Sequence, residues 1–272
     1  MAVDRARLTT TTARRTRVRR PTSGIDLLAL AGAAIGFLAI LGGSALEGLS
    51  VAGLANLPAA VIVLGGTLGA VILQTPAATL RGALQRLRWI VMPPPVDLEY
   101  LADRMSDWSR QVRRGGLVSL EEIAAQEKDP FVRAGAQMVA DGGDIGSLQR
   151  TLELENEHRL GADLAAAGVF RSMGGYAPTI GIVGAVLGLI QVMGHLDDPS
   201  QLGIGIATAF VATIYGVGSA NLLFLPLADR LRAIAEIQWQ RRAMVVEGLV
   251  CLSEGEHPSR IRARLNGYLA GM

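Results

Sequence analysis

Most polar side chains inside the long apolar segments of this sequence are hydroxyls. They include Thr67, Thr179, Thr208, Thr213, Tyr215 and Ser219. No Asp, Glu, Lys, Arg or His lies inside these segments, except Asp26 at the edge of the first. An ion path through a membrane usually contains an ionisable side chain. If this protein moves ions, a partner must therefore supply the binding carboxylate, which the hydroxyls here can only surround.

Two positions in the last two apolar segments are predicted to lie at the same depth. Because a helix rises 1.5 Å per residue, Ala185 lies about 20 Å from Ser172, and Thr213 lies about 21 Å from Leu227. The two segments run in opposite directions, so both distances are measured from the same side. Ala185 and Thr213 are therefore expected to form part of a ring around a partner's carboxylate.

The spacing of the remaining reactive residues does not support other chemistry. Cys251 is the only cysteine, so no intrachain disulfide can form. The histidines, His158, His195 and His257, lack the spacing of metal ligands, and the DGGD stretch at 141–144 lacks the other ligands of a calcium loop. The apolar segments offer no Ser/His pair, paired aspartates or metal ligands, so we expect no enzyme, no metal and no cofactor.

The composition is that of a membrane protein with a sizeable soluble part. Half of the 272 residues are apolar and 18% are charged. A span needs about 20 predominantly apolar residues to cross a bilayer, and the segments that come close to this or exceed it are 25–46, 57–75, 172–194 and 203–227. The first is not a cleaved signal peptide, because its apolar run is too long and a second span follows almost at once. We expect four transmembrane helices in two hairpins.

Arginines are concentrated on one side of these spans. Seven of them precede Ile25, and the others that flank the spans are Arg81, Arg86, Arg88, Arg159, Arg171, Arg230, Arg232, Arg241 and Arg242. The short connections 47–56 and 195–202 contain no Lys or Arg. Cytoplasmic loops carry an excess of basic residues. The expected topology is therefore N-in/C-in, with both termini and the long middle segment cytoplasmic.

The spans divide the chain into five predicted parts. They are a basic, disordered N-terminus (1–24), a first hairpin (25–75), a cytoplasmic domain (76–171), a second, channel-lining hairpin (172–227) and a cytoplasmic C-terminal helix or tail (228–272). The Thr/Arg-rich N-terminus is interpreted as a topology signal, with lipid or partner binding as the alternative.

The cytoplasmic domain is predicted to be all-α. Apolar residues recur at three- and four-residue steps over 98–112, and a fresh helix is expected from Asp129-Pro130 to about residue 140. Ser119 and Glu122 are placed to form a capping box between these helices. Leucines from 148 to 164 predict a further helix that can run into the third span.

Small residues and two prolines shape the spans. Glycine or alanine at four-residue spacing lets helix backbones approach closely in lipid, either within one chain or between copies in an oligomer. The pairs are Gly32/Gly36, Gly65/Gly69, Gly184/Gly188 and Ala212/Gly216. Pro178 and Pro226 each remove a backbone donor near the cytoplasmic side. They are expected to act as bending points or to be tolerated kinks.

Four stretches carry a resemblance to a known family. They are "PAAVIVLGGTLGAVILQTP" (58–76), "RRGGLVSLEE" (113–122), "DPFVRAGAQMVADG" (129–142) and "MGGYAPTIGIVGAVLGLIQVMGHLDDPSQLGIGIATAFVATIYGVGSANLLFLPLADRL" (173–231). They resemble the bacterial flagellar motor stator A subunit, the MotA/PomA family of the MotA/TolQ/ExbB ion channel superfamily. The resemblance covers about residues 24–240 in order, and it implies a multi-pass protein of the bacterial inner membrane.

The resemblance also implies a partner and a mechanism. Five copies would surround two copies of a MotB/PomB-type B subunit, whose single span carries the ion-binding aspartate. Ion flow would turn the ring, and the cytoplasmic domain would push on the rotor switch protein FliG. The family's rotor-contact charges fall on Arg113 and Glu121, with Arg114 and Glu122 as neighbouring candidates. Its two functional prolines fall on the prolines named above, and no nucleic acid is expected as a partner.

The resemblance bears on the transported ion. Sodium-driven members carry a threonine where this chain has Ala185, and proton-driven members often have alanine there. Thr213 matches the more general pore threonine, and Thr179 is a further hydroxyl expected along the channel. Sodium needs several oxygen ligands to replace its hydration shell, so we expect protons, with a sodium-driven stator of the same family as the alternative.

Two other functions compete with this interpretation. An energiser of outer-membrane processes, of the ExbB/TolQ type, would have three spans and an outside N-terminus, unlike the two hairpins expected here. A passive membrane scaffold would not need hydroxyls and prolines matched in depth.

Overall fold

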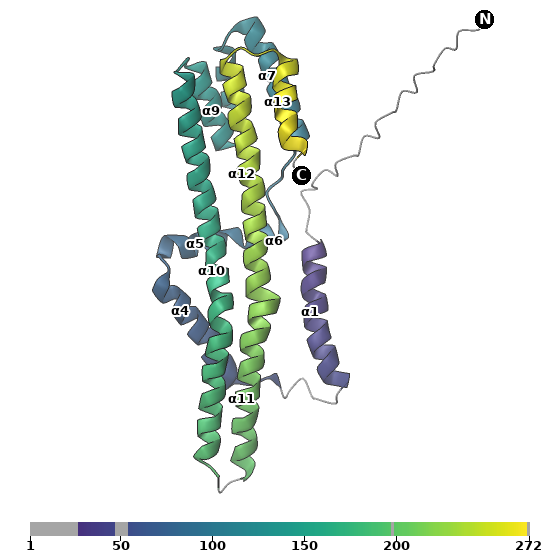
Figure 1. Ribbon diagram of the computed structural model, residues 1–272, viewed down its shortest axis with the longest axis vertical. Helices are drawn as coiled ribbons and strands as arrows, with labels where there is room; N and C mark the ends of the chain where they lie inside the picture. Colours follow the sequence, from purple (N-terminus) through teal and green to yellow (C-terminus); the bar gives the residue numbers. More distant parts are fainter. Residues whose placement is uncertain (1–26, 47–53, 197–198, 271–272) are drawn as a thin grey trace, which may run out of the picture.

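The chain is a long helical rod in the computed structural model, which describes residues 27–46, 54–196 and 199–270. Every regular element in these ranges is a helix, so the all-α prediction is confirmed for the described residues. Two antiparallel columns run the length of the rod (Figure 1). One is α10 (Ile145–Met193), and the other joins α11 (Pro199–Ser219), the π-helical turn η2 (Ala220–Phe224) and α12 (Leu225–Ser253).

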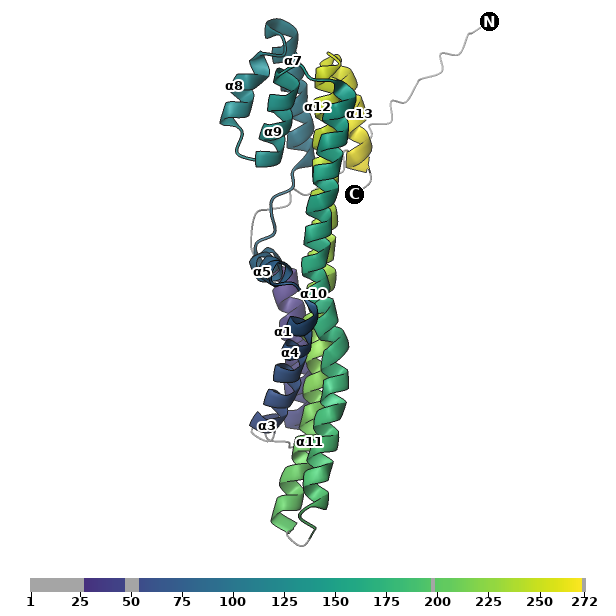
Figure 2. The ribbon, with the colours of Figure 1, turned by 90° about the vertical axis from the view of Figure 1, so that its left-hand side faces the viewer.

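Apolar helices make up the end of the rod around α11. Three helical segments are long and apolar enough to cross a membrane: Leu57–Gln74, α10, and the column Leu202–Ser253. The apolar helix α1 (Leu27–Leu46, 20 residues) lies beside the second column (Figures 1 and 2) and begins two residues inside the first predicted span. The basic segment 1–24 lies outside the described residues.

The segment Leu57–Gln74 is made of α3 (Leu57–Ala60), the π-helical turn η1 (Val61–Gly65) and α4 (Gly66–Gln74). It begins where Asn56 Oδ1 accepts the backbone N–H of Ala59 at 3.0 Å, a side-chain cap on an otherwise unpaired donor. It ends before Pro76, because a proline disfavours helical backbone in the residue that precedes it. The chain then turns across the columns as α5 (Ala77–Arg86) and α6 (Arg88–Val91) (Figure 1).

A helical head forms the opposite end of the rod. It contains α7 (Leu98–Gly115), α8 (Ser119–Gln126), α9 (Pro130–Ala140), α13 (Pro258–Ala270) and the adjoining ends of α10 and α12. These elements share one core, whose largest fully buried side chains are Met105, Leu120, Phe131, Leu152, Met244, Leu249, Leu252, Ile261 and Leu265. Residues between 244 and 265, from the predicted C-terminal helix or tail, therefore contribute to the head core.

The predicted helices of the head are present, and one predicted cap is wrong. The helices over 98–112 and 130–140 are α7 and α9, and the helix over 148–164 continues into the third apolar segment as α10. Ser119 does not form a capping box. It is the first residue of α8, and its hydroxyl donates to the carbonyl of Gly116 at 2.7 Å. Gly116 adopts φ +75°, which turns the chain so that Ser119 faces back onto the loop.

Candidate functional site

The α10–α11 hairpin is packed through backbones rather than long side chains. A Cβ on Gly181 would lie 2.9 Å from the carbonyl oxygen of Ala212, and one on Gly216 would lie 2.6 Å from the carbonyl oxygen of Ala177. A Cβ on Gly188 would likewise meet the backbone of Ala209 at 2.8 Å. Such close approach is available only where both helices carry small residues. The four-residue spacing of small residues therefore serves to pack two helices of the same chain.

This packing sets the relative depth of the two expected channel positions. A Cβ on Gly184 would lie 2.8 Å from Cβ of Ala212, so the two helices touch at this pair of residues. Ala185 comes directly after Gly184 on α10, and Thr213 comes directly after Ala212 on α11. Thr213 is exposed, Ala185 is half-buried, and the Thr213 hydroxyl donates to the carbonyl of Ala209 at 3.3 Å. Thr179, also exposed, lies six residues from Ala185, about 9 Å along the helix toward the head. The hairpin thus presents two threonines to whatever lies outside it.

Three of the other hydroxyls noted in the sequence are hydrogen-bonded within the chain, and the fourth, on Thr67, is buried without a hydrogen-bond partner in the described residues. Tyr215 donates to the carbonyl of Leu54 at 2.5 Å, and Thr208 accepts from the Asn56 side chain at 2.9 Å. These bonds tie the start of α3 to α11. Thr67 is fully buried, and the Ser219 hydroxyl donates to the carbonyl of Gly216 at 3.3 Å. Thr67, Thr208 and Tyr215 are therefore not placed to form a ring with Thr213.

The two prolines lie at neighbouring points of the two columns. Pro178 is inside α10, which continues through it, and Pro226 follows the π-helical turn η2 at the start of α12. In that turn the N–H of Leu225 bonds back to the carbonyl of Ala220, five residues earlier. A π-turn and a proline are both causes of helix bending. The columns also touch here, because a Cβ on Gly174 would lie 2.5 Å from the Leu225 side chain.

The expected rotor-contact charges lie at the far end of the head. Arg113 and Arg114 are in the last turn of α7, and Glu121 and Glu122 are in the first turn of α8. The α7–α8 turn is at the opposite end of the rod from the α10–α11 turn (Figure 2). All four side chains are exposed, and none has an ion pair within the described ranges. Each sign also suits its helix end, since acidic groups favour N-termini and basic groups favour C-termini.

Two carboxylates, the buried Glu127 and the half-buried Asp129, hold the loop between α8 and α9 in place. Burial raises the pKa of Glu127, but the hydrogen bond from the N–H of Asp129 at 2.9 Å and the ion pair with Arg104 outweigh it and lower that pKa. Burial also raises the pKa of Asp129, but the ion pair with Arg241 at 2.7 Å opposes this, and the pKa is lowered. Each pair therefore stabilises the head at pH values above the ordinary pKa of its carboxyl group. This stability is lost as the pH falls through the lowered pKa.

A buried polar cluster joins the membrane-side helices to the head. In this neck network, Arg86 of α5 donates to Asp163 of α10 at 2.6 Å through Nε and approaches it at 2.5 Å through Nη2. Arg242 of α12 lies 3.6 Å from the other oxygen of Asp163 and donates through Nε to Asn156 Oδ1 at 2.7 Å. Asn156 donates in turn to the carbonyl of Trp239 at 3.2 Å. Sequence analysis missed this network, because Arg86 and Arg242 had been assigned only to the topology signal.

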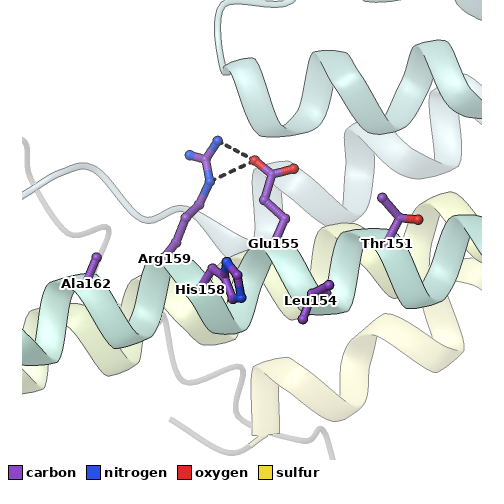
Figure 3. Close-up of a pocket in the computed structure, with 6 residues that line it drawn as sticks. All are labelled: Thr151, Leu154, Glu155, His158, Arg159 and Ala162. Atoms are coloured by element: carbon purple, nitrogen blue, oxygen red, sulfur yellow. Dashed lines mark hydrogen bonds and ion pairs between the residues drawn. The ribbon is translucent and has the colours of Figure 1, made fainter.

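A surface hollow on α10 offers no competing chemical site. Its lining residues project from one side of the helix (Figure 3) and are Thr151, Leu154, Glu155, His158, Arg159 and Ala162. Glu155 and Arg159 pair with each other at 2.6 Å. No group of three or more His, Cys, Asp or Glu residues that could hold a metal occurs in the described part of the chain.

Comparisons with known proteins agree with this architecture. The family described as "MotA/TolQ/ExbB proton channel family" matches residues 123–244. Motility protein A of Bacillus subtilis is 32% identical over 246 residues, which cover 90% of this chain and 91% of that protein.

Two solved structures have the same fold over nearly the whole chain. The structure of C. jejuni MotAB aligns with a TM-score of 0.84 at 25% identity, covering 90% of this chain and 96% of that one. The flagellar MotAB stator complex from Bacillus subtilis aligns with a TM-score of 0.81 at 31% identity, covering 89% of this chain and 95% of that one. The chain therefore belongs to the MotA family of flagellar stator ion-channel subunits.

Proposed function

We propose that this chain, with a MotB-type B subunit, couples ion flow across the bacterial inner membrane to torque on the flagellar rotor. The similar structures are MotAB complexes, and the last three apolar segments of this chain contain no Asp, Glu, Lys, Arg or His of their own to bind an ion. The B subunit would supply the carboxylate, and Thr213, Thr179 and the backbone near Ala185 would line its path. In this arrangement the chain spans the membrane four times with both termini in the cytoplasm.

The observation that carries the proposal is the continuity of α10. It is a single helix of 49 residues, about 70 Å long, from the head to the end of the hairpin. A displacement of the hairpin about the B subunit is therefore passed to the head without an intervening loop. Pro178 and Pro226, at the level where the columns touch, would set how the hairpin tilts relative to the head.

The exposed apolar side chains of α10 support an assembly of several copies. Ile182, Val183, Val186, Leu187 and Ile190 are each at least 46% exposed in the single chain. We propose that neighbouring copies, the B subunit and lipid cover them in a ring of five A subunits. The test is co-expression with candidate B subunits in a motile host that lacks its own stator. Restored swimming supports the proposal, and failure with every B subunit that reaches the membrane contradicts it.

Reversing the charge of Glu121 is expected to impair swimming. In the proposed function Glu121 and Arg113 face charges on the rotor protein FliG, and a like-charge contact at an interface both slows encounter and opposes docking. Because Glu121 is exposed and unpaired within the described residues, Glu121→Lys should leave folding intact. Swimming speed and the amount of protein in the membrane are the measurements.

The matched control for this charge reversal is Glu99→Lys. Glu99 is exposed on α7 at the end of the helix far from Arg113, so it lies outside the proposed contact. We expect this variant to swim normally. Equal loss of swimming in both variants, or normal swimming of Glu121→Lys, would remove Glu121 from the rotor contact.

The transported ion is proposed to be the proton. Ala185 offers no side-chain oxygen at the depth of Thr213, whereas a dehydrated sodium ion needs several oxygen ligands in place of its water. Swimming speed should therefore fall when a protonophore collapses the proton gradient and should not depend on external sodium. Speed that follows sodium and ignores the protonophore would identify a sodium-driven stator instead.

A further inference from the structure

The segment formed by α5 and α6 lies across the rod between the apolar helices and the head. It begins three residues after α4 ends at Gln74, and it crosses the two long columns rather than running along them (Figures 1 and 2). Its sequence is unusual in charge, since residues 48–96 contain three arginines and no Asp or Glu. A helix at this level has one side against the columns and one side away from them.

The inner side of this segment is fully occupied by the chain itself. Leu80, Ala83, Leu87 and Ile90 recur at three- and four-residue steps and pack into one cluster with Val71, Ala166, Ala167, Val169, Phe170, Ala228 and Leu231. Arg86 completes the attachment through its ion pair with Asp163. The orientation of α5 about its own axis is therefore fixed by contacts on this side.

The outer side carries arginines and apolar residues in alternation. Arg81, Leu84, Arg88 and Val91 follow one another at three- and four-residue steps, and all four are exposed. Leu84 is 68% exposed, and Met92, next to Val91, is 65% exposed. Neither Arg81 nor Arg88 has a side-chain partner in the described part of the chain. A basic, apolar face of this kind is typical of helices that lie in the plane of a membrane surface.

We propose that this outer face binds the headgroups of anionic phospholipids. The proposal rests on the membrane position given by the proposed function, because an apolar span ends only three residues before α5. Leu73, in the last turn of α4, is 89% exposed in the single chain, so acyl chains at this level would continue over Leu84 and Met92. The Arg81 and Arg88 side chains lie along this surface with their guanidinium groups toward water, where phosphate oxygens accept their hydrogen bonds.

The expected preference of this face for anionic lipid follows from the charge of its two arginines. A basic residue near an anionic membrane surface gains an attraction equivalent to about a fivefold preference. Two arginines on one face, with no carboxylate nearby in the sequence, should therefore enrich anionic over zwitterionic lipid around α5. Arg86 does not contribute, because Asp163 already neutralises it.

Trp89 provides the readout, since it follows Arg88 in the sequence, packs against the inner cluster and is partly exposed. The full chain with its B subunit is placed in nanodiscs of mixed phosphatidylglycerol and phosphatidylcholine. The bromine quencher is carried either by the phosphatidylglycerol or by an equal amount of the phosphatidylcholine, so the membrane charge stays constant. The quenching that is lost in Trp89→Phe is assigned to Trp89.

We expect brominated phosphatidylglycerol to quench Trp89 at least twice as strongly as brominated phosphatidylcholine. This threshold is set below the preference of about fivefold that each arginine contributes. The double variant Arg81→Gln/Arg88→Gln should remove this difference, and the control Arg110→Gln/Arg150→Gln, on exposed arginines of the head, should retain it. Equal quenching by both lipids in the unmodified protein, or a difference that survives the first double variant, overturns the lipid preference alone. Absence of quenching by either lipid would contradict the membrane position as well.

Discussion

Replacing Gly216 with alanine is expected to disrupt the α10–α11 hairpin. The added Cβ would lie 2.6 Å from the carbonyl oxygen of Ala177 and 3.0 Å from Cα of Gly181, and both are backbone atoms that no rotamer change can move. The two helices must separate, which costs about 1–3 kcal/mol in a well-packed interior. The loss outweighs the gain of up to about 1 kcal/mol that alanine brings to a helix in place of glycine.

The matched control is Gly218→Ala, two residues further along the same helical column. A Cβ at Gly218 would meet no atom of the described residues within 4 Å, so only the gain in helix propensity remains. The two variants should therefore change thermal stability in opposite directions, with Gly216→Ala lowering and Gly218→Ala preserving or raising it. Thermal unfolding of the purified protein and swimming of the host are the measurements. Equal behaviour of both variants would show that the close approach at Gly216 is not needed.

The same comparison shows what glycine spacing can and cannot predict. Four-residue spacing correctly indicated close helix packing at Gly184, against Cβ of Ala212, and at Gly188, against the backbone of Ala209. It also marked Gly65 and Gly69, where an added Cβ would meet no atom of the described chain within 4 Å. The spacing is a property of one helix. The tertiary arrangement decides which helix packs against these small residues, and whether that helix belongs to the same chain.

Local patterns predicted α7, α9 and the head part of α10, and long-range packing decided the rest. The apolar repeat in α7 and the proline at the start of α9 are contained within each helix, so periodicity and capping identified them. The place of α13 could not be found in this way. Ile261 and Leu265 reach the head core from the end of the chain, where they pack among residues such as Met105 that are far away in sequence.

The candidate site residues are indicated by the family resemblance, and their roles stay predictions. The charges around the α7–α8 turn have no ion pair in the described chain, and the Thr213 hydroxyl donates to Ala209 of its own helix, so no long-range contact marks these residues. Thr208 and Tyr215 have the same hydroxyl chemistry, but Asn56 and Leu54 engage them from 152 and 161 residues away. Hydrogen bonds at such separations leave no mark on the local pattern.

The neck network provides the second large expected effect. Asp163→Ala should destabilise the protein by about 3–5 kcal/mol, because it leaves Arg86 and Arg242 facing each other in a buried site without their shared anion. Burial already lowers the pKa of Arg242, and Asp163 is the main group that opposes this. For a chain of this size the loss corresponds to a melting temperature lower by roughly 10 °C. Swimming should be lost as well, since α5, α10 and α12 are joined at this point.

An exposed ion pair between the same two columns gives the control. Arg171 of α10 pairs with Asp229 of α12, and their side chains are 57% and 64% exposed. Exposed pairs contribute about 0–1 kcal/mol, so Asp229→Ala should leave the melting temperature nearly unchanged. Replacing Arg86, Asp163 and Arg242 together with leucine should recover much of the stability lost in Asp163→Ala, because no buried charge is then left unpaired.

The triple variant separates stability from function. If the neck network serves only to hold the columns together, the leucine variant should swim once its melting temperature has recovered. If directional ion pairs are needed to keep α5 in register with α10 and α12 while torque is transmitted, swimming stays impaired at normal stability. We expect the second result, because apolar contacts allow the helices to slide whereas the Arg86–Asp163 hydrogen bond at 2.6 Å fixes one position. Full swimming of the stable leucine variant would assign the network a purely structural role.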